Sequence, residues 1–186
     1  MTTENARLFI GIGLPKEHQD RLAEMAQRLL GELSQGNVTR TGNFHLTLKF
    51  LGETPRDRIP QMKAAIQVAA EKSDAFVLTL GTLGYFSKGR ERIYWLGGEP
   101  SRALSQLKEN LDQALGDEGE PAEEIFTSHV TLIRRGIPAK DKSWKEVQER
   151  INPQELTHGV DRVVLFESTR INGLITYVPL AEFQLK

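Results

Sequence analysis

"HLTLKFLG", residues 45–52, is the stretch that decides the fold, because nearly the same pattern returns as "HVTLIRRG" at residues 129–136. In a β-strand successive side chains point to opposite faces, so His45 and Thr47 share one face while the residues between and after them share the other. The same holds for His129 and Thr131. Each strand is therefore predicted to bury an aliphatic face and to present a histidine with a hydroxyl on the opposite side.

The sequence around these two strands is also duplicated. Residues 7–29, "RLFIGIGLPKEHQDRLAEMAQRL", resemble residues 93–115, "IYWLGGEPSRALSQLKENLDQAL", and each is followed by a histidine strand, a helix and a further strand. This β-α-β-α-β repeat predicts an α+β fold with two pseudo-symmetric lobes, antiparallel-leaning sheets, helices outside and a central cleft. We expect one bilobal domain over residues 1–186, with lobes near 1–88 and 89–186 and terminal strands able to exchange between them.

Hydrophobic patterning and turn residues predict the individual elements. The first helix is expected to end at Gly31, and the second to begin at Thr54 as N-cap with Pro55 in the first turn, although Pro60 leaves that start open. The acidic stretch 116–124 is predicted to be a solvated loop without chemistry. The expected strands are 7–14, 43–52, 75–86, 92–98, 127–136, 160–168 and 175–185, and the later helices are 99–116 and 141–151.

Composition excludes several classes of function. The chain of 186 residues contains no cysteine, which excludes disulfides, thiolate zinc sites and cysteine nucleophiles and favours the reducing cytoplasm. A formal net charge of -1 disfavours binding of long duplexes by bulk phosphate neutralisation. The first apolar run is short and no basic region precedes it, which is wrong for a signal peptide or a membrane span. We expect a cytoplasmic monomer that does not bind membranes.

Two imidazoles and two hydroxyls around one cleft suit in-line attack on a phosphodiester. The ordinary pKa of histidine, near 6.5, allows one neutral ring to accept a proton from the nucleophile while a protonated ring donates to the leaving oxygen. Threonine hydroxyls can donate to the non-bridging phosphate oxygens. The arrangement needs no metal and no cofactor. The sequence contains no HExxH spacing, no G-x-S-x-G elbow and no G-x-G-x-x-G fingerprint.

The two motifs resemble the paired HxTx motifs of the two-histidine phosphoesterase superfamily. Within it, "RLFIGIGLP", "RIYWLG" and "YVPLAEF" resemble the bacterial and archaeal RNA 2',3'-cyclic phosphodiesterases, also called 2'-5' RNA ligases. The resemblance implies that RNA ends or nucleotides with a 2',3'-cyclic phosphate are hydrolysed to a 2'-phosphomonoester. It also implies that His45 donates a proton to the leaving 3' oxygen, that His129 activates water, and that Thr47 and Thr131 bind the phosphate.

Two further candidates lie five residues after each histidine. Arg134 follows His129 at this spacing and resembles the family's additional phosphate or transition-state contact, for which a guanidinium fork is suited. Phe50 follows His45 at the same spacing and is a candidate for stacking on a base. A solvated strand-end charge for Arg134 and a core aromatic for Phe50 are the purely structural interpretations. Either histidine strand, taken alone, could also hold an ordinary core or edge histidine.

The sequence leaves the exact reaction open. The same site could join RNA ends such as tRNA halves by a 2'-5' linkage, act on another 2'-5' or cyclic nucleotide, or bind RNA ends without catalysis. Many relatives carry a basic residue and a proline where this chain has Glu124 and Ser128, which leaves its RNA affinity and preference open as well. The two histidines outside the motifs, His18 and His158, are predicted to be solvated surface residues.

Overall fold

The computed structural model describes residues 4–121 and 125–186 of the chain. The strands are β1 (Asn5–Gly13), β2 (Leu33–Val38), β3 (His45–Pro55), β4 (Phe76–Leu80), β5 (Thr82–Lys88), β6 (Glu91–Gly98), β7 (Ser128–Pro138), β8 (Leu156–Val160), β9 (Arg162–Ile171) and β10 (Leu174–Gln184). The helices are α1 (Lys16–Leu30), α2 (Ile59–Glu71), α3 (Arg102–Leu115) and α4 (Trp144–Ile151), with single 3-10 turns η1 (Thr41–Asn43) and η2 (Arg56–Arg58).

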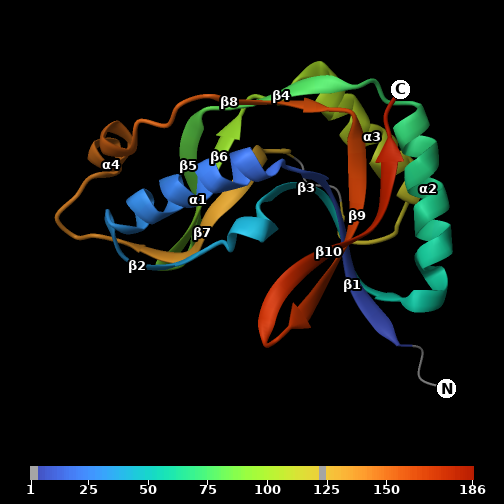
Figure 1. The fold of residues 1–186 in the computed structure, drawn as a ribbon, viewed down its shortest axis with the longest axis horizontal. Coiled ribbons are helices and arrows are strands. Elements are labelled where there is room, and N and C mark those ends of the chain that lie inside the picture. The colour runs from blue at the N-terminus through green and yellow to red at the C-terminus, as the bar shows by residue number, and fades with distance from the viewer. Residues whose placement is uncertain (1–3, 122–124) are drawn as a thin grey trace.

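The main sheet has eight strands in the order β10-β9-β1-β3-β7-β6-β5, and β2 pairs with β7 from outside this path. Strands β4 and β8 form a separate two-stranded ribbon, and every pairing in both sheets is antiparallel. Helices α1 and α4 lie with β2, β5, β6 and β7, whereas α2 and α3 lie together beside β9 and β10 (Figure 1). The predicted α+β fold class, with its mostly antiparallel sheet, is confirmed.

The two halves of the main sheet meet where β3 and β7 run side by side. One residue pair is in register between them, Leu46 with Val130. These are the residues between histidine and threonine in the two motifs. Because the strands are antiparallel, His45 lies level with Thr131 and Thr47 lies level with His129. This junction therefore sets both motifs on one face of the sheet.

The terminal strands complete the half of the sheet that β1 begins. Strand β9 pairs with β1, and β10 pairs with β9 at the sheet edge. Asn172 and Gly173, both with positive φ, close the β9–β10 hairpin, which suits the Asn-Gly sequence of a tight hairpin turn. Strands β9 and β10 therefore extend the main sheet beyond β1.

The aliphatic faces predicted for both histidine strands are buried. Leu46 and Val130 are 0% exposed, and Leu48 and Leu132 are likewise inside the core. The opposite face of each strand carries the histidine and threonine, which are only partly buried. The prediction that each strand separates a core face from a polar face is confirmed.

Three details of the predicted elements are wrong. Thr54 is no helix cap, because β3 continues to Pro55 and Thr54 pairs with Ala6; α2 begins at Ile59 with Pro60 in its first turn, where a missing N–H costs little. The single strand predicted over 75–86 is two strands in different sheets, β4 and β5, separated at Gly81. Strands β2 and β8 were not predicted, because "LSQGNV" and "LTHGV" are short and largely polar.

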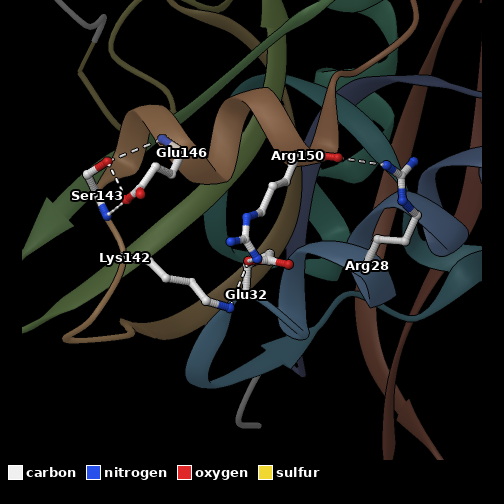
Figure 2. A network of polar contacts seen from close by, with 6 residues as sticks. All are labelled: Arg28, Glu32, Lys142, Ser143, Glu146 and Arg150. Atoms are coloured by element: carbon white, nitrogen blue, oxygen red, sulfur yellow. Dashed lines mark hydrogen bonds and ion pairs between the residues drawn. The ribbon is translucent and has the colours of Figure 1, made fainter.

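Helix α4 is fixed against the end of α1 by a polar network (Figure 2). Ser143 caps α4 in a capping box with Glu146, whose carboxylate accepts from the Ser143 backbone N–H at 2.7 Å. Arg28 donates to the carbonyl of Arg150 at 3.2 Å. The carboxylate of Glu32 meets Lys142 at 2.8 Å and Arg150 at 3.5 Å. These contacts join the C-terminal end of α1 to α4 on the β2–β7 side of the molecule.

Candidate active site

Each histidine strand contains an extra residue immediately after its threonine. The extra residue is Leu48 on β3 and Leu132 on β7, so the register shift falls at the same place in both motifs. A bulge of this kind reverses the alternation of side chains beyond it. As a result Phe50 and Arg134 come to the face that carries the histidines, although simple alternation would place them on the other face. The pairs that flank the shifts are Gly11–Thr47 with Ile10–Lys49, and Trp95–Thr131 with Tyr94–Ile133.

Both imidazoles are oriented by a backbone carbonyl two residues earlier. The Nδ1 atom of His45 lies 2.7 Å from the carbonyl oxygen of Asn43, and the Nδ1 atom of His129 lies 2.7 Å from that of Thr127. A carbonyl oxygen only accepts, so we assign the proton of each neutral ring to Nδ1 and its lone pair to Nε2. The Nε2 atom of His45 lies 2.8 Å from Thr47 Oγ1. The two motifs thus prepare the same ring atom for proton transfer.

Aromatic side chains surround each histidine. The ring of His45 lies 4.7 Å from that of Phe9 and 5.0 Å, edge-on, from that of Tyr177. The ring of His129 lies 5.0 Å, edge-on, from Phe86 and 6.0 Å from Trp95. These rings hold the imidazoles in place and lower the polarity around them.

Glycines make room for the aromatic wall beside His129. The indole of Trp95 lies so close to Gly97 that a Cβ there would stand 2.8 Å from the ring, and at Gly84 a Cβ would overlap it more severely. Only glycine allows the backbone to approach a ring this closely. The two glycines therefore let Trp95 lie across β5 and β6 against His129.

The pKa of His45 is lowered to about 4. Burial is the main cause, because it disfavours the charged imidazolium, and the nearby charges of Arg134 and His129 act in the same direction. The hydrogen bond to the Asn43 carbonyl opposes them by favouring the protonated ring. In the free protein His45 is therefore neutral at physiological pH.

Three adjoining hollows lie over this face and share residues. The first, of about 240 Å³, is lined by Thr47, Phe50, Phe86, His129, Thr131 and Arg134 among others. The second, of about 290 Å³, is lined by His45, Thr131, Arg134, Arg40 and Tyr177 among others. The third, also about 290 Å³, is lined by His45, Phe50, Arg134 and Tyr177 among others. Arg134 lines all three, and each of the six residues selected from the sequence lines at least one of them: His129 borders the first, and His45 borders the second and third.

Phe50 and Arg134 both border the hollows, and the structure excludes the purely structural interpretation of Phe50 alone. Phe50 is 41% exposed at the cleft, so it is not a core aromatic. Arg134 is exposed and lines all three hollows on the histidine side of the sheet, so its role there stays a prediction. Neither His45 nor His129 belongs to the hydrophobic core, since each ring borders a hollow. Among the described residues no group of three histidine, cysteine or acidic side chains is placed to hold a metal ion.

The remaining histidines differ from their prediction as solvated surface residues. His18 and His158 are both partly buried, and their rings meet edge-on at 5.6 Å. Strand β8, which was not predicted, brings them together, and burial lowers the pKa of His158. Both lie outside the three hollows.

The departures from the family motif are only partly visible. Glu124 lies outside the described residues. Ser128 is fully buried at the first position of β7, in register with Gly98. The acidic stretch borders the site, because Glu120 and Pro121 line the first hollow.

Several residues at the site were missed by sequence analysis. Asn43 and Tyr177 hold His45 from two sides, yet 134 residues separate them in the chain. Phe86 and Trp95 come from the β5–β6 hairpin, and Arg40 from the segment before η1. No local signal marks any of them, because their position depends on which strands pair.

Comparison with known proteins places the chain among similar sequences and structures. A family model described as the 2'-5' RNA ligase superfamily matches residues 14–172. An RNA 2',3'-cyclic phosphodiesterase of Thermotoga maritima is 29% identical over 88% of this chain and 87% of the relative, and one of Escherichia coli is 27% identical over 98% of each. The crystal structure of E. coli LigT complexed with 3'-AMP superposes with a TM-score of 0.80 and 28% identity, covering 98% of this chain and 99% of that one. No helix within the described residues is long and apolar enough to span a membrane.

Proposed function

The chain belongs to the 2'-5' RNA ligase superfamily, and from this we propose that it hydrolyses a 2',3'-cyclic phosphate at an RNA end to a 2'-phosphomonoester. The observation that carries the proposal is the pairing of Leu46 with Val130, which sets two histidine–threonine pairs side by side on one face. Curated relatives with this activity in their names, similar over nearly the whole chain, support the choice of substrate.

Water is the nucleophile, and His129 is its base. The neutral ring donates from Nδ1 to the Thr127 carbonyl, which leaves the lone pair on Nε2 to accept a proton from water as its oxygen attacks phosphorus. The bond between phosphorus and the 3' oxygen breaks as the new bond forms. The products are a 2'-phosphate and a free 3' hydroxyl.

Thr47, Thr131 and Arg134 bind the phosphoryl oxygens. The two hydroxyls come from equivalent positions of the two motifs and both line the first hollow, together with Arg134. Hydrogen-bond donors fixed in advance stabilise the charge that gathers on these oxygens in the transition state. The guanidinium is suited to contact two oxygens at once.

His45 donates the proton that the departing 3' oxygen needs. Its pKa of about 4 in the free protein means that the ring must gain a proton when substrate binds. The negative charge of the bound phosphoryl group favours the imidazolium form of His45 and so raises its pKa. After turnover the rings exchange protons with solvent, and no other group is consumed.

Phosphate binding is therefore expected to raise the pKa of His45. In the free protein its imidazole should titrate near 4, and saturating inorganic phosphate or adenosine 2'-phosphate should move the titration toward 6.5. NMR titration of the histidine ring resonances with and without ligand measures this. His158, outside the hollows, serves as the internal control and should not respond. An unchanged titration of His45 would contradict its place at the phosphate.

The product identifies the reaction directly. Adenosine 2',3'-cyclic phosphate should yield adenosine 2'-phosphate, separated from the 3' isomer by chromatography, and EDTA should leave the rate unchanged. A 3'-phosphate product would reverse the roles of the two ribose oxygens. A rate abolished by EDTA would refute acid–base catalysis by the histidines alone.

Ligation of RNA ends is the second candidate function. The first hollow, beside His129, is lined by the exposed rings of Phe50 and Phe86 and is wider than a water molecule requires. An RNA 5' hydroxyl in place of water would bring a nucleoside into this hollow and form a 2'-5' linkage. Joined product from tRNA halves distinguishes ligation from hydrolysis.

The domain division, the cellular location and the oligomeric state of the protein are also part of the proposal. We describe it as one bilobal domain with lobes near 1–88 and 89–186, and the pairing of β9 with β1 supports an exchange of terminal strands between them. The lack of cysteine supports a cytoplasmic location. The monomeric state stays a prediction.

A further inference from the structure

Resting on the proposed function, we infer that the second hollow, beside His45, binds the phosphodiester immediately upstream of the cyclic phosphate. The substrate would then be an RNA chain end in preference to a mononucleotide. We refer to this hollow, lined by Arg40, Asn43, His45, Arg134, Arg135 and Tyr177 among others, as the upstream hollow.

The direction of the chain follows from the roles of the two histidines. His45 donates to the 3' oxygen, so the ribose of the terminal nucleotide lies on the His45 side of phosphorus and the attacking water lies on the His129 side. The 5' oxygen of that ribose leads to the preceding nucleotide. The upstream phosphate must therefore leave the cleft past His45, and the upstream hollow lies there.

Charge selects this hollow over its neighbour. Among the described residues, three arginines and no acidic side chain line the upstream hollow. The third hollow, which also borders His45, is lined by Arg7 and Arg134 together with the carboxylate of Glu120. A phosphodiester carries a full negative charge, and a nearby carboxylate would repel it. Ile175 and Tyr177 line both hollows and provide an apolar wall against which a ribose or base can lie, so the carboxylate of Glu120 is what distinguishes the two.

Arg40 is the residue best placed to bind this phosphate. Its Nη1 donates to the carbonyl of Ile175 at 2.9 Å and lies 3.1 Å from Thr176 Oγ1, so the guanidinium is fixed against the β9–β10 hairpin at the rim of the hollow. These bonds use one nitrogen of the fork, and the others remain to contact phosphate oxygens. A side chain already ordered loses less entropy when ligand binds.

Arg135 has a weaker claim. Its φ of 53° is a left-handed conformation that non-glycine residues rarely adopt, and it follows Arg134 directly. Its guanidinium pairs with Glu91 at 3.2 Å, which offsets part of its charge. Arg40 is therefore the position that tests the inference.

Three substrates separate the upstream charge from the rest of the chain. They are adenosine 2',3'-cyclic phosphate, adenylyl-adenosine with a terminal 2',3'-cyclic phosphate, and the same dinucleotide with a neutral methylphosphonate linkage. The wild-type protein should hydrolyse the charged dinucleotide with a kcat/KM about tenfold above that of the methylphosphonate. Arg40→Gln should reduce this ratio to about 1, and Arg40→Lys should retain part of it.

The ratio distinguishes phosphate binding from support of the hairpin. If Arg40 only holds Ile175 in place, Arg40→Gln lowers kcat/KM for both dinucleotides equally and the ratio persists, which overturns the inference. Arg170→Gln is the matched control, because Arg170 lies on the same hairpin, donates to Gly173 and lies outside the hollow; it should keep the wild-type ratio. Equal rates for the two dinucleotides in the wild type would also overturn the inference. No turnover of any substrate would instead refute the proposed function.

Discussion

His129→Ala and His45→Ala should each lower kcat for hydrolysis of a 2',3'-cyclic phosphate by about 10²–10⁴-fold, the range expected when one acid–base group is removed. Each ring has an Nδ1 committed to a carbonyl and an Nε2 suited to proton transfer, so each loss removes one of the two transfers. The measurement is steady-state release of 2'-phosphate at saturating substrate.

A substrate with a different leaving group separates the two histidines. The 4-nitrophenolate of a 4-nitrophenyl phosphodiester leaves without needing a proton. His45→Ala should therefore recover much of its activity on that substrate, whereas His129→Ala should not. His158→Ala is the control, because that histidine is also partly buried but lies outside the cleft. Circular dichroism checks that every variant is folded. Wild-type rates in either cleft variant would remove the histidine from the mechanism.

The core of this site could be predicted because a local pattern specified it. A histidine and a threonine separated by one buried leucine or valine specify a strand with one polar face, and the repetition of the pattern indicates two such strands meeting. In the structure the two repeated strands do meet, through the pairing of Leu46 with Val130. A pattern read from neighbours in the chain sufficed because alternation in a strand is a local property.

The bulges show where local reasoning ends. Alternation from His45 places Phe50 on the core face, and only the extra residue Leu48 returns it to the cleft; Leu132 does the same for Arg134. Nothing in either leucine distinguishes a bulged position from a regular one. Both candidates stand at the same spacing from their histidines, and Arg134 was selected also for its resemblance to the family's phosphate contact; the duplicated bulge explains why this spacing reaches the histidine face.

Residues that depend on long-range pairing could not be predicted. Asn43 connects His45 to the β9–β10 hairpin. Its backbone carbonyl contacts the imidazole of His45. Its side-chain amide donates to the Ile175 carbonyl at 2.9 Å, and its Oδ1 accepts from the Tyr177 N–H at 3.3 Å. This arrangement exists because β9 pairs with β1 and brings the hairpin beside η1. Polar strands such as β2 and β8 were missed for the same reason, since their partners rather than their sequences make them strands.

Arg134→Lys should lower kcat/KM about 10²-fold, nearly as much as Arg134→Gln, because a single ammonium cannot reproduce a fork that grips two phosphoryl oxygens. The two variants differ in their effect on His45. Burial is the main cause of the lowered pKa of that ring and the charge of Arg134 adds to it, so Arg134→Gln should raise the pKa above its value of about 4 while burial still holds it below 6.5, and Arg134→Lys should change it less.

These two readouts separate binding geometry from charge. If Arg134 were a solvated strand-end charge, both variants would retain wild-type kcat/KM and leave the titration of His45 unchanged. Arg170→Lys, at an exposed hairpin position, gives the effect of an arginine-to-lysine change away from the cleft. Recovery of activity by lysine together with a restored His45 titration would show that positive charge alone is required, and the bidentate contact with phosphate would be wrong.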